Sequence, residues 1–188
     1  MRDYVEIRFH GRGGGGVWTA AQIVALSAIK EGKYAQCFPL FGPERAGAPI
    51  EAYARISGEP IRIHSMVESP DVAVVLERSL LPLSTKGLNK NSILVINSKT
   101  MNDELKKVFS RGIKVFLVPA SDIAIKHLGR PIVNTAMVGA LVKVTRVVKL
   151  ETVKGVILDL LGEKLGKNLV EKNIKAVEEA FNEVREIA

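Results

Sequence analysis

The chain has 188 residues, of which 47% are hydrophobic, and a formal net charge of +7. This composition is sufficient for a buried core and favours a single domain over residues 1–188. The single cysteine, Cys37, excludes an internal disulfide and cannot by itself hold an iron–sulfur cluster or a structural zinc ion.

The localisation and the partners follow from what the composition lacks. Apolar runs are too short for a membrane span, and no signal-peptide pattern is visible, so we expect a cytoplasmic protein with no membrane contact. Aromatic residues make up only 5% of the chain, and no nucleic-acid motif is present, so we expect no nucleic-acid partner. The positive charge then belongs to an ordinary solvated surface or to a basic face that meets an acidic partner.

A run of glycines separates the first predicted strand from the first predicted helix. Residues 4–9 alternate as a strand, residues 17–29 are apolar on all sides, and the chain between them reads H-G-R-G-G-G-G from His10 to Gly16. Glycine permits positive φ and close approach, and a helix start adds unpaired N–H groups. An anion such as a phosphate, or a packed subunit surface, fits this concavity, and we expect the apolar helix to lie against a sheet or another subunit.

The same glycines also match the dinucleotide-binding pattern G-x-G-x-x-G at Gly11, Gly13 and Gly16. That pattern requires an acidic residue at the end of the second strand to bind a ribose hydroxyl. The second predicted strand, 33–38, has none. A tight packing turn without any ligand is the other alternative.

Residues 32–63 predict a strand, an irregular segment and a hairpin. Gly32 ends the first helix, residues 39–49 are rich in Gly and Pro, and residues 50–56 and 61–63 read as two strands joined by a turn. The irregular segment holds Glu44 and Arg45 next to Gly47, and it is expected beside the glycine run, where Arg12 and Arg45 would share an anion. A local or intersubunit ion pair between Glu44 and Arg45 is the alternative.

Three continuous apolar runs, 72–76, 93–96 and 115–118, predict strands covered on both faces in a parallel or mixed sheet. Helical patterns occupy 102–110, 122–127, 135–145 and 169–187, with Asn134 as the expected N-cap of the third. The histidines His10, His64 and His127 lack metal-ligand spacing and favour structural roles. Cys37 favours a small core residue, and no catalytic constellation appears.

Several motifs in one order carry a family resemblance. They are residues 6–14 with 19–22, residues 32–39, residues 41–45 with 47–49, and residues 134–140. Together they resemble the gamma subunit of pyruvate and related 2-oxoacid:ferredoxin oxidoreductases, over about residues 5–181. Two positions depart from the family pattern, since Gly15 replaces a glutamine of the glycine run and Ala46 replaces a second arginine after Arg45.

The resemblance implies a complex that decarboxylates a 2-oxoacid on thiamine diphosphate with Mg²⁺, passes electrons through iron–sulfur clusters to ferredoxin, and transfers the acyl group to coenzyme A. It implies companion alpha, beta and delta subunits that carry the thiamine and the clusters, so that this chain alone binds no cofactor. The gamma chain then supplies a subunit interface and part of the coenzyme A environment.

We therefore predict an α/β, Rossmann-like three-layer domain with a mostly parallel sheet and an added β-hairpin. No catalytic and no metal-binding residue is predicted. The alternatives are an NAD-type dinucleotide-dependent oxidoreductase and a free-standing nucleotide or acyl-coenzyme A binding module. The predicted cofactor-binding residues are Gly11, Arg12, Gly13, Gly14, Gly15, Gly16, Glu44, Arg45, Gly47, Asn134 and Thr135.

Overall fold

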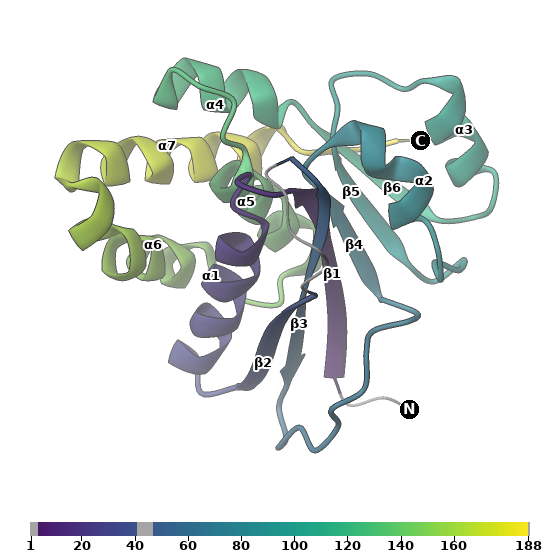
Figure 1. Ribbon diagram of the computed structural model, residues 1–188, viewed down its shortest axis with the longest axis horizontal. Helices are drawn as coiled ribbons and strands as arrows, with labels where there is room; N and C mark the ends of the chain where they lie inside the picture. The colour runs from purple at the N-terminus through teal and green to yellow at the C-terminus, as the bar shows by residue number, and fades with distance from the viewer. Residues whose placement is uncertain (1–3, 41–46, 188) are drawn as a thin grey trace.

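The computed structural model describes residues 4–40 and 47–187 (Figure 1). The strands are β1 (Tyr4–Arg12), β2 (Tyr34–Leu40), β3 (Pro49–Ser57), β4 (Val72–Val75), β5 (Ile93–Asn97), β6 (Lys114–Val118) and β7 (Arg185–Glu186). The helices are α1 (Val17–Lys30), α2 (Leu81–Ser84), α3 (Asp103–Phe109), α4 (Ala120–Leu128), α5 (Asn134–Thr145), α6 (Leu150–Leu165) and α7 (Lys167–Glu183), with a 3-10 turn, Arg78–Leu80, before α2.

The strands form one seven-stranded sheet in the order β2-β3-β1-β4-β5-β6-β7. The neighbours β1, β4, β5 and β6 are parallel, whereas β2, β3 and β7 are antiparallel to the strands beside them. The predicted α/β class with a mostly parallel core is confirmed. All three strands predicted from continuous apolar runs are the parallel strands β4, β5 and β6, which helices cover on both faces.

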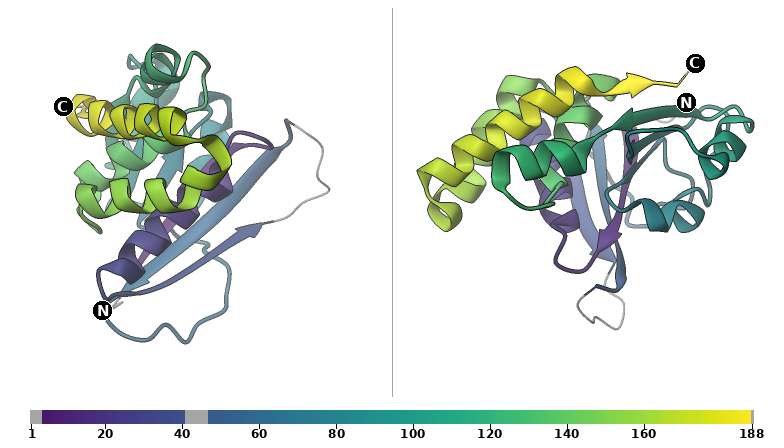
Figure 2. Two further views of the ribbon diagram at one scale, coloured as in Figure 1. Left: turned by 90° about the vertical axis from the view of Figure 1, so that its left-hand side faces the viewer. Right: turned by 90° about the horizontal axis from the view of Figure 1, so that it is seen from above.

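Helices cover the sheet from both sides, which gives the predicted three layers (Figure 2). One face carries the main core under α1, α4, α5, α6 and α7, and the other carries a smaller core under α2 and α3. Helix α1 packs on β2 and β3 and contacts α5 and α6, as its apolar sequence predicts. It still leaves Leu26 and Ile29 partly exposed.

The predicted hairpin between 50–56 and 61–63 is wrong. Strand β3 is paired along its length with β1 on one side and β2 on the other, so neither edge of β3 is free for residues 61–63. Those residues have no regular secondary structure, and the hairpin of this sheet is β2–β3. Part of the segment predicted to be irregular, 39–49, therefore belongs to these two strands.

Two helices were not predicted. Helix α6 contains Gly155 and Gly162, which weaken its helical pattern, and its Val153, Val156 and Ile157 are buried by α1 and α7. Helix α2 is a single turn that begins at Leu81 and has Pro82 as its second residue. Tertiary packing stabilises both helices, and the local sequence indicates neither.

Candidate functional site

The glycine run lies at the carboxyl edge of the parallel strands. Strand β1 ends at Arg12, and α1 begins at Val17 after the cap residue Gly16. The N–H of Gly13 donates to the carbonyl oxygen of Ala48 (2.9 Å), and that of Gly15 donates to Arg12 (2.9 Å). Among the described residues, the N–H groups of Gly14 and Gly16 donate no backbone hydrogen bond. These N–H groups and the first turn of α1, which holds no acidic residue, can receive an anion.

Two of the glycines are required by close packing. A Cβ on Gly11 would lie 2.4 Å from Cγ2 of Val17, and a Cβ on Gly16 would lie 2.4 Å from Nδ2 of Asn134. Gly16 also has a φ of +73°, in the region that glycine favours. The packing explanation is therefore sufficient for these two positions. Gly14 faces open space and leaves room for a ligand or a partner.

The second loop lies beside the first, as the sequence predicts. The N–H of Gly47 donates to the carbonyl oxygen of Gly13 (3.3 Å), and Nη1 of Arg12 donates to the carbonyl oxygen of Gly47 (3.0 Å). Glu44 and Arg45 lie outside the described residues. The exposed Arg12 guanidinium thus joins the glycine run to the described end of the second loop at Gly47.

A third loop, which the sequence did not indicate, completes this edge. It follows β4, and the hydroxyl of Ser79 accepts a hydrogen bond from Nη2 of Arg12 (2.9 Å). After β1 the chain crosses to the face that holds α1, whereas after β4 it crosses to the face that holds α2. Neighbouring parallel strands whose connections leave to opposite faces form the crevice in which α/β proteins bind ligands. The glycine run lies at this position in the sheet, after β1 and beside β4.

Asn134 and Thr135 have different surroundings. Asn134 is the first residue of α5, its side chain caps nothing, and the cap residue is Val133, so the predicted N-cap role is wrong. The Asn134 amide instead packs against Gly16 of the glycine run. Asn134 is 7% exposed, and its Oδ1 is buried without a hydrogen-bond partner. Thr135 is fully buried and donates to Oδ1 of Asn173 on α7 (2.9 Å).

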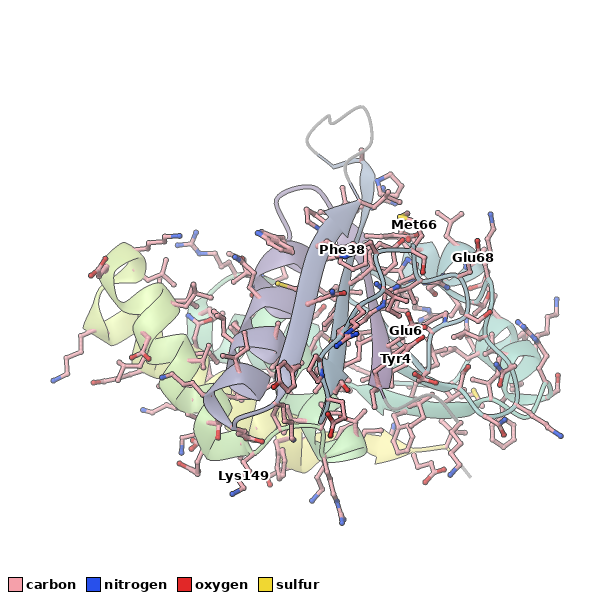
Figure 3. The ribbon with its side chains drawn as sticks, turned by 90° about the horizontal axis from the view of Figure 1, so that it is seen from below. Tyr4, Glu6, Phe38, Met66, Glu68 and Lys149 are labelled. Atoms are coloured by element: carbon pink, nitrogen blue, oxygen red, sulfur yellow. The ribbon has the colours of Figure 1, made fainter. Side chains whose placement is uncertain are left out.

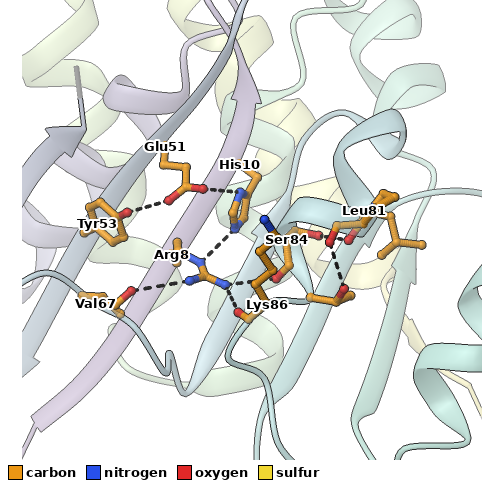
Figure 4. A network of polar contacts seen from close by, with 10 residues as sticks. Arg8, His10, Glu51, Tyr53, Val67, Leu81, Ser84 and Lys86 are labelled. Carbon is orange, nitrogen blue, oxygen red and sulfur yellow. Dashed lines mark hydrogen bonds and ion pairs between the residues drawn. The ribbon is translucent and has the colours of Figure 1, made fainter. Parts of the chain in front are cut away.

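A buried polar network lies directly below the glycine run, on β1 and β3 (Figure 4). Nε of Arg8 donates to Nε2 of His10 (2.9 Å), Nδ1 of His10 lies 3.4 Å from Oε1 of Glu51, and the Tyr53 hydroxyl donates to Oε2 of Glu51 (2.5 Å). Burial, and then the charge of Arg8, lower the pKa of His10 to about 3. Burial, with the neighbouring Glu51, raises the pKa of Tyr53. His10 is therefore neutral and structural, in agreement with the role predicted for it.

Neither metal nor thiol chemistry has an evident centre in residues 4–40 and 47–187. No group of three His, Cys, Asp or Glu side chains that could hold a metal lies there. Cys37 is half-buried in β2, and burial raises the pKa of its thiol. Within the same residues, no helix has both the length and the apolar character needed to cross a membrane.

Comparisons with known proteins show to which family the chain belongs. The family described as "Pyruvate ferredoxin/flavodoxin oxidoreductase" matches residues 6–183. The chain belongs to this family. The gamma-type resemblance predicted from the motifs is confirmed by relatives in several archaea and in a bacterium.

Three members of the family illustrate the similarity. The "Pyruvate/ketoisovalerate oxidoreductases common subunit gamma" of Thermococcus kodakarensis is 50% identical, with 95% of this chain and 96% of the relative aligned. The "Pyruvate synthase subunit PorC" of Methanocaldococcus jannaschii is 47% identical, with 96% and 97% aligned. The crystal structure of the pyruvate oxidoreductase subunit of Thermotoga maritima superposes with a TM-score of 0.87 at 36% identity over all of both chains.

The dinucleotide alternative receives no support from the geometry. In a dinucleotide-binding fold the strand that carries the ribose-binding acid lies parallel to the first strand and beside it. Here β2 is an edge strand, separated from β1 by β3 and antiparallel to β3. The end of β2 is therefore not placed to bind the ribose of a nucleotide on the glycine run.

Proposed function

We propose that this chain is the gamma subunit of a multisubunit pyruvate or branched-chain 2-oxoacid:ferredoxin oxidoreductase, and that the glycine run binds an anion within that complex. The anion is a phosphate of coenzyme A or a carboxylate of a companion subunit. The observation that carries the proposal is the convergence of the exposed Arg12, the N-terminus of α1, Gly47 and Ser79 at one edge of the sheet.

The residues present fit coenzyme A better than the other cofactors that the family implies. A phosphate requires N–H and guanidinium donors, and Arg12, Gly14, Gly16 and the first turn of α1 supply them. An iron–sulfur cluster requires several thiolates, and the sequence has only Cys37. We assign the clusters, and thiamine diphosphate with its Mg²⁺, to the companion alpha, beta and delta subunits, and ferredoxin to the assembled complex in the cytoplasm.

The individual roles follow from the geometry. Gly11 and Gly16 allow the approach of α1 and α5, Gly13 and Gly47 join the two loops, and Gly15 closes the glycine run onto Arg12. Arg12 offers the charge, and the Asn134 amide adds a polar group at Gly16. Thr135 fixes the start of α5 through its hydrogen bond to Asn173 on α7. The proposal extends to Glu44 and Arg45 as the continuation of the second loop.

The test is an Arg12→Ala variant in the assembled complex. If the anion belongs to coenzyme A, the KM for coenzyme A rises about tenfold while kcat changes little, equivalent to ~1.4 kcal/mol of binding free energy. Ser79→Ala is the matched control, because it removes the hydrogen bond but keeps the guanidinium. If the anion is a companion carboxylate, Arg12→Ala instead weakens assembly in a salt-dependent way. Unchanged KM and unchanged assembly contradict the proposal.

A further inference from the structure

The positive charge of the chain is concentrated in one stretch. From Lys86 to Lys114 there are seven lysine and arginine residues and two acidic ones, so this stretch carries a formal charge of +5 out of the +7 of the chain. All seven basic side chains are exposed. Basic and acidic residues nearly balance in the rest of the sequence.

Most of these charges form no salt bridge with a carboxylate of the described residues. Lys99 pairs with Asp122 (2.6 Å) and Lys106 with Asp103 (3.0 Å), both at exposed positions. Within the described residues, the other five have no carboxylate oxygen within 4.0 Å. These five are Lys86, Lys90, Lys107, Arg111 and Lys114, and they define a basic surface.

The basic surface is distant from the glycine run. Lys90 and Arg111 precede β5 and β6, and Lys114 is the first residue of β6, so they lie at the amino ends of parallel strands, whereas the glycine run follows the carboxyl end of β1. Arg111 donates from Nη2 to the carbonyl oxygen of Leu88 (3.0 Å), and a Cβ on Gly112 would lie 3.5 Å from Cβ of Lys90. These contacts bring the loop before β5 and the loop before β6 together on the side of the molecule that holds α2 and α3 (Figure 1).

An apolar groove adjoins this surface. It has a volume of about 220 Å³ and lies between α2 and α3, with Leu81, Pro82 and Val108 in its lining. Lys107 and Arg111 also line it, together with the acidic Glu104. Leu83 on α2 and Phe109 on α3 are each 40% exposed on the same two helices. An apolar centre next to charged residues is the usual composition of a protein–protein interface.

We propose that the basic surface and the groove between α2 and α3 dock an acidic surface of a companion subunit. This inference rests on the proposed function, in which the chain works in a multisubunit enzyme. Five basic side chains without carboxylate partners create a positive electrostatic potential at this surface, and an acidic partner neutralises it on docking. The apolar groove then supplies the contact area that is excluded from water.

The first experiment maps the contact in the intact complex. The chain is co-expressed with its companion subunits, and the purified complex is treated with a carbodiimide, which joins lysine amines to carboxylates in direct contact. We expect cross-links from Lys86, Lys90, Lys107 or Lys114 to Asp or Glu residues of one companion. Lys164 and Lys167, exposed at the turn between α6 and α7, are the control lysines and should give none.

The second experiment reverses the charge. Lys86→Glu with Lys90→Glu changes the surface by four charge units in an exposed loop, and Lys164→Glu with Lys167→Glu makes the same change elsewhere. The first pair should weaken association about tenfold or more at ~0.1 M salt, and the control pair should have little effect. Melting temperatures measured on the two free variant chains test whether each variant folds.

The outcomes separate the two proposals. If the complex forms and neither pair of substitutions changes its association, the basic surface is only solvated and this inference is wrong, while the proposed function stands. If both pairs weaken association equally, net charge and not this surface controls assembly, and the inference is again wrong. If the wild-type chain forms no complex with the companions, the proposed function fails and this inference fails with it.

Discussion

The face of the sheet opposite α1 has two halves that are held by different interactions. Under α2 and α3, strands β4, β5 and β6 present apolar side chains, such as Val75, Leu94 and Val115, each fully buried. Beside them, β1 and β3 present Glu6, Arg8, His10 and Arg55, all at most 6% exposed. One half is stabilised by burial of apolar surface, and the other by matched polar partners.

The segments that pack over the two halves also differ. No helix lies over the polar half in the described structure, and residues 58–70 pass across it without regular secondary structure (Figure 3). Arginines of the sheet hold this segment by its backbone, since Arg55 donates to the carbonyl oxygen of Ser65 and Arg8 donates to that of Val67. A substitution in the polar half should therefore change the free energy of unfolding according to which charged or polar partner remains buried. A substitution in the apolar half should change it according to the side-chain volume that is lost.

The largest effect is expected from Arg55→Met. Nε of Arg55 lies 2.8 Å from Oε1 of Glu6, with both side chains at most 7% exposed, so the substitution removes the guanidinium that faces this buried carboxylate. The free energy of unfolding should fall by about 3–5 kcal/mol, measured by urea denaturation. The double variant Glu6→Leu with Arg55→Met removes both charges and should recover most of that loss. Equal losses for the single and double variants would show that packing, and not charge matching, governs this half.

A smaller effect is expected from Leu94→Ala in the apolar half. Leu94 is fully buried in the core under α2 and α3, and its truncation loses transfer free energy and leaves a cavity. The free energy of unfolding should fall by about 3 kcal/mol with an unchanged urea m-value. Leu94→Met keeps the volume and should cost less than ~1.5 kcal/mol. A loss as large for Leu94→Met as for Leu94→Ala would contradict the cavity explanation.

Over a single pH unit, the smallest effect is a pH dependence of the polar half. Burial, and then the charge of Arg8, lower the pKa of His10 from 6.5 to about 3, so between these values the unfolded chain binds a proton that the folded chain does not. The contribution of His10 to stability is therefore complete above pH 6.5 and falls by ~1.4 kcal/mol per pH unit as the pH drops toward 3.

The variant His10→Gln should lose this part of the slope when unfolding is measured from pH 7 to pH 4. Leu94→Ala serves as the control, because its effect on stability should be independent of pH in this range. A wild-type slope retained by His10→Gln would show that other groups titrate instead.

Local patterns in the sequence predict much of this fold. Continuous apolar runs predict β4, β5 and β6, because only strands covered on both faces tolerate them. The three- and four-residue steps of Val170, Val177 and their neighbours predict α7, which buries that stripe. The contact between the glycine run and the second loop follows from their shared position after strands.

Other features depend on partners that are distant in the chain. Nothing near Ser79 marks it as the hydrogen-bond acceptor of Arg12, since 67 residues separate the two. Asparagine is a residue type that often caps helices, but the Asn134 side chain packs against Gly16 and makes no cap hydrogen bond. Residues 61–63 alternate as a strand does, but β2 and β1 already occupy both edges of β3.

The sequence by itself therefore determined the fold class, the family and the glycine run, because hydrophobic period, turn chemistry and motif order are local properties of the chain. Only the tertiary structure decided that Arg12 is held between Gly47 and Ser79, that Arg8 and Arg55 are buried with their partners, and that Lys107 and Arg111 line the groove between α2 and α3. Hydrogen bonds, ion pairs and surface potential depend on distances of a few ångströms between residues far apart in sequence, and folding alone sets those distances.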